Sequence, residues 1–542
     1  MPAEICGKLA QLKGKRFATV RGMDVIETLR QEVQEGRIGP ERLVDLLASQ
    51  QRQLQTTHQQ LQATQQQLEA ARQRIEELEK KLGVPPPTAK LDQPFSMRAE
   101  EQRQQARGKK PKGKRKGRRG RFRTRDKIAL AERSEAVFPE GVPPKECHLS
   151  HIRPVWRLED RRAVLIAYQI YRAPSGRYGQ IPGVLGRSEY GLEIVTEIAH
   201  LVYVVGLSFD KVCALLHFFQ DLKLTKSQAN VLLYRLSRHW ERQFEVLCTL
   251  LANSFVVHAD ETSWSLNSVW AFLSEKARVL LFGVHKDADT LKQILDPETF
   301  AGIVISDDAA VYENFTAAQK CWAHLVRKAI KLTLQDPNNG DYRNLADRLL
   351  EIYREACRIQ RDQRFSEAGR AEKVAALEDE IFALCGSVKF TEPSDLDQLA
   401  NDHRLLVAEV FRLMMAKQLF TFVTAKPVQQ PNGCTMPVAG TNNEAERTLR
   451  NPAQARDTGR TNKTSNGARR QSILTSVLES LRVYLPTYTL GSVVAELKRW
   501  AATGLSCFER LLKKLKLPPR QGTKSILDQI LPSPCPVAIP TG

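Results

Sequence analysis

The chain has 542 residues, of which 42% are hydrophobic, and its formal net charge of +20 comes from 81 Lys and Arg against 61 Asp and Glu. The length predicts about three or four domains, and the hydrophobic share is too high for a mostly disordered chain. The positive charge favours a polyanionic partner. No run approaches the roughly 20 apolar residues that a spanning helix needs, so a membrane partner is not expected.

Ten cysteines are scattered along the chain, and no two have the two-residue gap that is typical of zinc ribbons. A zinc module of that kind and an extracellular disulfide framework are therefore not expected. The first 20 residues contain no continuous apolar stretch, so we expect no signal peptide. The cysteine pattern predicts reduced thiols in a cytoplasm.

Residues 41–84, which follow an N-terminal segment over 1–40, have the composition of a long helix. Within this range, residues 42–82 are rich in Gln, Glu and Arg and contain neither Gly nor Pro. The period of seven predicts a coiled coil for self-association, although the companion seam positions are mostly polar, so a solvated single helix is the alternative. The heptad positions are Leu47, Leu54, Leu61, Leu68, Ile75 and Leu82.

A basic run over 103–127 lies within a segment that we expect to be a disordered linker, residues 85–135. Glycines interrupt the run and no apolar period is present, so it cannot bury a core. It either solubilises the chain or neutralises phosphates without recognising sequence, and the scarcity of acids favours nucleic acid. The candidate DNA-binding residues here are Lys109, Lys110, Lys112, Lys114, Arg115, Lys116, Arg118 and Arg119.

Residues 136–253 predict a mixed, largely helical domain. A short strand is expected over 164–171, and a capping-box pair, Thr225 and Gln228, marks the start of its last helix. The last two helices form either a helix-turn-helix that binds DNA or an ordinary helical pair. The helices are expected over 193–205, 209–219 and 226–251.

Two apolar strands further along the chain each end on an acid. Residues 255–260 end on Asp260 and residues 303–307 end on Asp307, with a hairpin and a helical turn between them. If these strands lie side by side, the apposed carboxylates share a proton or bind a cation; two acids in surface turns are the alternative. Carboxylates suit Mg²⁺ or Mn²⁺, and two such ions roughly 4 Å apart can drive displacement at phosphorus.

Four motifs in order resemble the insertion-sequence-66 family of bacterial DDE transposases, and the resemblance spans about residues 180–490. They are His258-Ala259-Asp260-Glu261-Thr262, Ser306-Asp307-Asp308 followed by Tyr312, Cys321-Trp322-Ala323-His324, and Asn442-Asn443-Glu444-Ala445-Glu446-Arg447 followed by Arg450.

The resemblance implies an α/β catalytic core that is ribonuclease H-like, with a mixed sheet flanked by helices and a helical insertion. It also implies metal-dependent cleavage at transposon ends and strand transfer into target DNA. Asp260, Asp307 and Glu446 would hold two Mg²⁺ (or Mn²⁺) ions. Glu261 and Asp308 are neighbouring rivals, and Glu444 is a stronger one. Residues two apart on a helix face differently, so only one of Glu444 and Glu446 can point to the metals.

Other residues near these motifs are candidates for supporting roles. His324 is a general base, a zinc partner of Cys321 or a structural residue, and we favour a supporting role because two ligands do not make a zinc site. Trp322 packs in the core or stacks on DNA. The candidate contacts to the DNA backbone are Arg447, Arg450, Arg460 and Lys463, with a solvated basic face as the alternative.

The remaining boundaries follow from these motifs. We expect the first part of the catalytic core over 254–335, a helical insertion over 336–425, and the last part of the core with the third acid over 426–490. A C-terminal helix and a loose tail would follow over 491–542. The helices of the insertion are expected over 342–361, 370–384 and 395–419.

The resemblance also implies partners. We expect double-stranded DNA (transposon ends and target), a homo-oligomer through the coiled coil, accessory proteins from the same element, and a cytoplasmic, nucleoid-associated location. Family members often carry a cysteine-pair zinc module before the catalytic core, whereas Cys147 and His151 have no partners here. The alternatives are a domesticated or inactive DNA-binding protein and a ribonuclease H-like nuclease without strand transfer.

Overall fold

The computed structural model describes residues 123–264, 267–386, 398–462, 464–518 and 525–531, and four single positions between 48 and 62. Contacts divide the chain into two units, residues 1–90 and 91–542, and the description below concerns the second. Apart from those four positions, the expected coiled coil lies outside the described residues. The same is true of the eight basic candidates between 109 and 119, and of Lys463.

A three-stranded sheet begins the described part of the chain. Its order is β1-β3-β2, with β1 parallel and β2 antiparallel to β3. Val155, Ile166 and Ile170 are buried in a small core of its own. This sheet is larger than the single strand expected over 164–171, and its first elements lie where the linker was expected. The elements are α5 (Thr124–Ala129), β1 (Arg133–Val137), β2 (His148–Glu159) and β3 (Arg162–Arg172).

The second strand of this sheet escaped prediction because of its turn. Asp160 and Arg161 connect β2 to β3 with positive φ angles of 45° and 65°. Such two-residue turns usually contain Asn or Gly, which tolerate this backbone region, so Asp-Arg gives little turn signal.

The helices expected after this sheet are confirmed within a few residues. At the start of α8, Thr225 Oγ1 accepts a hydrogen bond from the Gln228 amide (3.3 Å) and Gln228 Oε1 accepts one from the Thr225 amide (3.0 Å), which is the expected capping box. The elements are α6 (Leu192–Ala199), a π turn (His200–Val204), α7 (Phe209–Gln220) and α8 (Lys226–Ala252).

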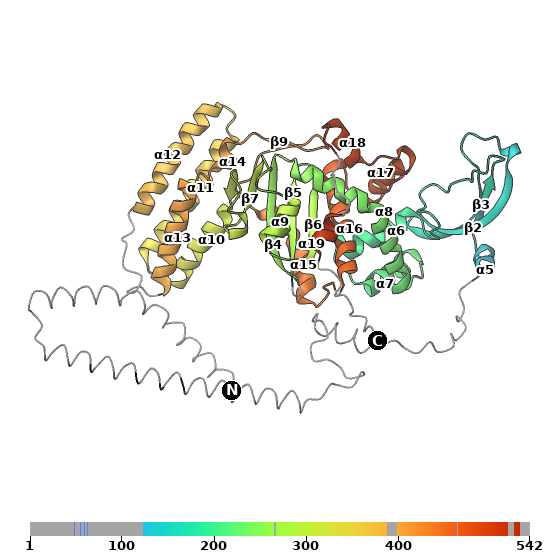
Figure 1. The fold of residues 1–542 in the computed structure, drawn as a ribbon, viewed down its shortest axis with the longest axis horizontal. Helices are drawn as coiled ribbons and strands as arrows, with labels where there is room; N and C mark the ends of the chain where they lie inside the picture. The colour runs from blue at the N-terminus through green and yellow to red at the C-terminus, as the bar shows by residue number, and fades with distance from the viewer. Residues whose placement is uncertain are drawn as a thin grey trace, which may run out of the picture. The chain divides into compact units, whose positions relative to one another are not determined.

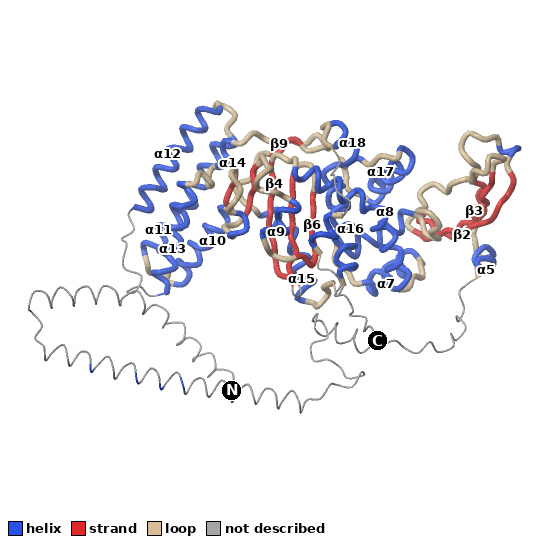
Figure 2. Tube along the Cα trace, viewed as in Figure 1, coloured by secondary structure: helices blue, strands red, loops and turns tan. Residues whose placement is uncertain are grey.

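A five-stranded mixed sheet forms the centre of the second unit, and its strands lie between helices (Figures 1 and 2). The order is β6-β5-β4-β7-β8, with β4, β7 and β8 parallel and β4, β5 and β6 antiparallel. The expected α/β architecture is therefore present, and it is compatible with a ribonuclease H-like core. The strands are β4 (Val256–Trp264), β5 (Asn267–Ser274), β6 (Arg278–Val284), β7 (Ile303–Ser306) and β8 (Ala318–Lys320); α9 (Ala288–Ile294) follows β6.

The two faces of this sheet pack into different cores. Val257 and Val304 join a core that includes α8 and α16 (Ser465–Tyr484). Val256 and Ile305, which alternate to the opposite face, join a core formed with the helical insertion. The three helices expected in the insertion are present as α11 (Gly340–Arg361), α12 (Glu367–Gly386) and α13 (Gln398–Met415). They are preceded by α10 (Trp322–Gln335), which lies in the segment assigned to the first part of the core, and followed by α14 (Thr421–Thr424).

The edge strand β6 is covered by serine hydroxyls of α16. Ser480, Ser476 and Ser472 accept hydrogen bonds from the amides of Arg278, Leu280 and Phe282 at 2.9, 2.9 and 3.0 Å. The serines are four residues apart, so they line one face of the helix. A helix thus satisfies backbone donors that an exposed edge strand would leave unpaired.

Residues 525–531, which lie within the tail that the sequence predicted to be loose, pack against the rest of the unit. Ile526 and Leu527 are at most 1% exposed, and the Ile526 amide donates to Glu245 Oε1 at 3.0 Å. Two apolar residues within a proline-rich flank gave too short a signal for a helix. The remaining elements are β9 (Val428–Gln429), β10 (Thr435–Met436), α15 (Asn443–Asp457), α17 (Leu490–Thr503), α18 (Cys507–Lys514) and α19 (Ile526–Ile530).

Candidate active site

The register of two parallel strands brings the first two acids together. β4 pairs with β7 through Val256 and Ile303, Val257 and Val304, and His258 and Ile305. Continuing this register by two residues places Asp260 opposite Asp307, and neighbouring strands lie about 4.8 Å apart. The expectation that Asp260 ends its strand is wrong, because β4 continues to Trp264 against β5. It is β7 that stops, at Ser306, and this leaves one flank of Asp260 open.

Asn442 is the fully buried N-cap residue of α15, the helix that carries the third acid. Its hydrogen bonds hold the start of this helix beside Asp260. Asn442 Nδ2 donates to the carbonyl oxygen of Ala259 at 2.8 Å, and its amide donates to Cys321 Sγ at 3.1 Å. Ala259 directly precedes Asp260, and Glu446 lies in the first turn of α15. The start of α15 is therefore held beside β4 and Cys321.

The electrostatics of Asp260 show that the three acids lie within interaction range. Burial is the main cause that raises the pKa of Asp260 to about 7, and Glu261, Asp307 and Glu446 raise it further. The Glu261 amide donates to Asp260 Oδ1 at 3.0 Å, which offsets part of this effect. Carboxylates that destabilise each other's charge in a partly buried place are electrostatically suited to a cation.

The rival acids each have a different partner. Glu444 pairs with Arg278, and Asp308 pairs with Arg412. Glu261 pairs with Lys286 at 2.5 Å and accepts a hydrogen bond from the Tyr312 hydroxyl. The two glutamates of the third motif thus point to different neighbours, since Glu446 is 2.6 Å from Arg327 and interacts with Asp260.

Two cations at the site were not expected from the sequence. Lys320 is 2% exposed, and its Nζ donates to the carbonyl oxygen of Asp307 at 2.9 Å. Burial lowers the pKa of Lys320. Arg327, one turn after His324 on α10, is half exposed and holds both oxygens of Glu446. Neither residue had a sequence signal, because isolated basic residues in a chain this basic do not stand out.

Cys321 and His324 lie beside the third acid. The Cys321 amide donates to the Ser306 carbonyl at 2.9 Å, next to Asp307. Cys321 Sγ, a ring nitrogen of His324 and a carboxylate oxygen of Glu446 all lie within 4.8 Å of one another. From the sequence we considered Cys321 and His324 together and favoured a supporting role for His324, because two ligands do not make a zinc site. The sequence could not supply the third member of the group, which is more than a hundred residues away.

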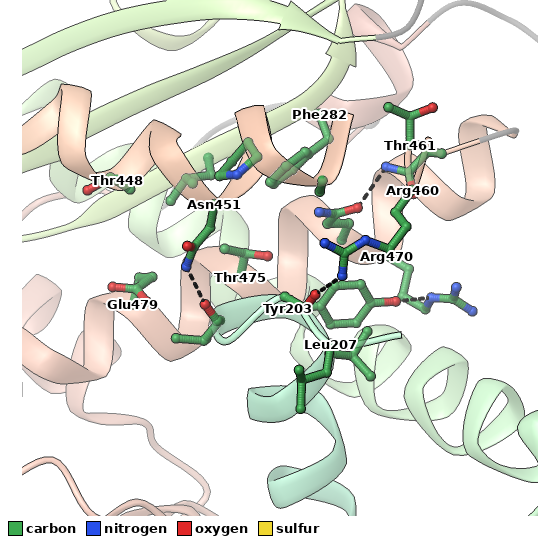
Figure 3. A pocket seen from close by; sticks show the side chains of 18 of the residues that line it. Tyr203, Leu207, Phe282, Thr448, Asn451, Arg460, Thr461, Arg470, Thr475 and Glu479 are labelled. Carbon is green, nitrogen blue, oxygen red and sulfur yellow. Dashed lines mark hydrogen bonds between the residues drawn. The ribbon is translucent and has the colours of Figure 1, made fainter. Parts of the chain in front are cut away.

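Two of the arginines proposed for DNA contact line a pocket on another side of α15. Arg447 and Arg460 lie there with Arg470, and Figure 3 shows Arg460, Arg470 and Tyr203 around it. Arg460 donates to the carbonyl oxygen of Gly206 in the loop after the π turn. The other lining arginines are Arg278 and Arg482, and the lining acids are Glu444 and Glu479.

The remaining candidates have varied positions. Arg450 is exposed on α15. Trp322 is fully buried and its Nε1 donates to the Leu419 carbonyl at 2.7 Å, so it packs in the core, and stacking on DNA does not fit. Cys147 and His151 belong to no group of three close metal-ligand side chains among the described residues, and the sheet around them has an apolar core. That sheet thus has a source of stability other than a metal ion.

No helix within the described residues is long and apolar enough to cross a bilayer. Basic composition, a mixed sheet and converging acids together are typical of enzymes that act on nucleic acids.

Comparison with known proteins identifies the family. The chain matches the family described as Transposase IS66 family over residues 187–470, which is more than half of its length and includes all three acids. The protein belongs to the IS66 family of transposases. A search of curated proteins found no match. Family membership supports a role as a transposase with DNA as its partner.

Proposed function

We propose that the protein is an active DDE transposase, which cleaves DNA at transposon ends and joins the ends to target DNA. In this proposal the five-stranded sheet is the core of a ribonuclease H-like domain, and Asp260, Asp307 and Glu446 are its metal ligands. The main support is that the β4–β7 register and the Asn442 hydrogen bonds bring together acids from three distant parts of the chain.

The donor set fits a pair of hard divalent cations. All three ligands offer carboxylate oxygens. Burial raises the pKa of Asp260 and repulsion from the neighbouring carboxylates raises it further, so a bound cation would stabilise the charged form. When bound, two Mg²⁺ (or Mn²⁺) ions activate the attacking oxygen and stabilise the leaving oxygen at phosphorus.

The other residues of the site position these ligands. Asn442 holds the start of α15 against β4, and Lys320 holds the backbone of Asp307. Arg327 pairs with Glu446, and its half-exposed guanidinium can turn to a phosphate instead. A cleft lined by Asp307, Lys320 and His324 opens beside the acids and gives DNA access to them.

DNA binding requires positive charge beyond the acids. We assign backbone contacts to residues after the third acid and in the basic arm, and we assign the pairing of two DNA ends to self-association through the coiled coil, with help from accessory proteins of the same element. The contact residues are Arg447, Arg450, Arg460, Lys463, Lys109, Lys110, Lys112, Lys114, Arg115, Lys116, Arg118 and Arg119.

A strand-transfer assay tests the proposal. The full chain is incubated with Mg²⁺ or Mn²⁺, a labelled duplex that carries the terminal repeat of the element, and a plasmid target. We expect joined products from the native chain and from Asp457→Asn, a matched control because Asp457 is an exposed acid at the far end of α15. We expect none from Asp260→Asn or Glu446→Gln.

Two outcomes would contradict the proposal. Joined products from both acid variants would move the chemistry to another site. Specific binding of the end duplex without products in either metal would support a DNA-binding protein derived from a transposase instead.

A further inference from the structure

The group formed by Cys321, His324 and Glu446 has a different chemistry from the three-carboxylate site. It offers one sulfur, one nitrogen and one oxygen ligand, all within 4.8 Å of one another. His324 Nδ1 lies 3.6 Å from Glu446 Oε1. Mg²⁺ prefers oxygen ligands, whereas thiolate and imidazole favour Zn²⁺ and similar transition metals.

We propose that Cys321, His324 and Glu446 form a binding site for a borderline-soft divalent cation, Zn²⁺ or Co²⁺, with one coordination position left for water. Three protein ligands and an open position are common in zinc sites that are not purely structural. The site shares Glu446 with the proposed carboxylate site, so occupancy by zinc withdraws the third acid from Asp260 and Asp307.

The backbone around Cys321 favours the thiolate that such a site needs. Cys321 is the N-cap residue of α10, and its Sγ accepts a hydrogen bond from the Asn442 amide at 3.1 Å. A bound cation would complete this stabilisation, since metal ligands must be deprotonated.

His324 supplies an independent sign of a missing partner. Its Nδ1 is buried and makes no hydrogen bond to any described residue. A buried polar atom without a hydrogen bond is unfavourable, and coordination to a metal would satisfy it. The three-residue spacing between Cys321 and His324 brings both to one side of α10, facing Glu446.

Arg327 competes for the same carboxylate. It pairs with Glu446 at 2.6 Å, and its side chain is 55% exposed. Surface ion pairs of this kind are weak, so zinc can displace Arg327 into solvent at little cost. Zinc binding therefore does not require rearrangement of the fold.

Metal binding by the full chain, without DNA, tests the site. Titration with Co²⁺ should produce a near-ultraviolet thiolate-to-cobalt charge-transfer band, which added Zn²⁺ abolishes. Cys321→Ser should lose the band, and His324→Ala should weaken Co²⁺ affinity at least tenfold, as expected for loss of a direct ligand. Cys434→Ser, which removes an exposed thiol, should leave both unchanged.

The outcomes are distinguishable. An unchanged band in Cys321→Ser, or an unchanged Co²⁺ affinity in His324→Ala, would overturn the proposal. Circular dichroism shows whether each variant folds. If Cys321→Ser does not fold, His324→Ala still tests the site, because His324 is only half-buried and its replacement disturbs the core less. The inhibitory consequence rests on the proposed function: Zn²⁺ should suppress strand transfer in Mg²⁺, and less so in His324→Ala. If the protein has no strand-transfer activity, the Co²⁺ titration still tests the metal site, because it does not depend on that activity.

Discussion

Helix α15 contributes to two sites of opposite charge, and the comparison between them is informative. Glu446 interacts with Asp260 beside the sheet, whereas Glu444 and Arg447 line the arginine-rich pocket. In the pocket two of the five arginines have acidic partners: Arg278 with Glu444, and Arg482 with Glu479 at 3.0 Å. At the acid site burial raises the pKa of Asp260, and the neighbouring carboxylates raise it further.

The two sites differ in net charge and therefore in the kind of ligand that each attracts. The pocket is lined by five arginines and two acids, so it keeps a positive excess that can attract a polyanion. The acid site has the opposite excess, because Lys320 donates to a backbone carbonyl and Arg327 forms its ion pair with Glu446 among the residues that the structure describes. The acids therefore attract a cation, whereas the pocket attracts an anion.

The largest effect should follow loss of an acid. Asp260→Asn, Asp307→Asn and Glu446→Gln should each lower strand transfer on the order of a thousandfold, because each removes a metal ligand. Glu444→Gln should reduce strand transfer much less, so that its rate stays at least tenfold above that of Glu446→Gln, since Glu444 pairs with Arg278. Rates of product formation under single-turnover conditions measure this, and equal losses from both glutamates would break the distinction between the two faces of α15.

Removal of the Asn442 side chain should have the next largest effect. Asn442→Ala removes the side-chain hydrogen bond to the buried carbonyl oxygen of Ala259. The start of α15 is then held less firmly against β4, so Glu446 would be less well positioned. We expect strand transfer to fall roughly tenfold to a hundredfold, with end binding nearly unchanged. Asn451→Ala, which loses a similar side-chain bond to Val204 on the pocket side, is the matched control. Similar losses of strand transfer in both variants would argue against a specific positioning role.

In chelator, the partly buried carboxylate of Asp260 should lower the free energy of unfolding. In the folded protein the pKa of Asp260 is about 7, against an ordinary value of 3.8. The folded state therefore binds more protons than the unfolded state between these values, and stability falls as the pH rises through this window. In chelator above pH about 7, Asp260→Asn should raise the free energy of unfolding by roughly 1–3 kcal/mol.

This gain has a defined pH dependence. It should disappear below pH about 4, where Asp260 is protonated in both states. Urea unfolding at several pH values measures it, with Asp457→Asn as the control. A gain that does not vary with pH would have another cause.

The smallest effect concerns single arginines. Arg447→Ala and Arg450→Ala should each weaken DNA binding by about threefold to tenfold and reduce the slope of log affinity against log salt by about 1, because each removes one phosphate contact. Both are exposed on α15. Filter binding at several salt concentrations measures the slope, and Arg364→Ala, which pairs with Asp362 after α11, serves as the control. No change in slope would place the DNA elsewhere.

The sequence predicted the elements with strong local patterns. The strands around Asp260 and Asp307, the helices of the insertion and the capping box of α8 were predictable, because each pattern lies within one short segment. The β2–β3 turn at Asp160 and Arg161 lacked the usual residues, and α19 was too short to recognise. Such elements form because tertiary packing supports them.

The site itself was predictable only in part. Motif order predicted the three acids, but the β4–β7 register, which sets Asp260 opposite Asp307 when continued by two residues, is a property of the folded sheet. Asn442 gave no signal of its bond to Ala259, and Cys321 with His324 was an incomplete ligand set until Glu446 joined it. Contacts between segments far apart in the chain have no local pattern to reveal them.

The central claim is that three carboxylates hold divalent cations, and a crystal structure grown in Mn²⁺ tests it most directly. Anomalous scattering should place manganese between the carboxyl groups of Asp260, Asp307 and Glu446, with Arg327 turned away from Glu446. Manganese bound elsewhere, or these three carboxylates free of metal at saturating Mn²⁺, would contradict the account.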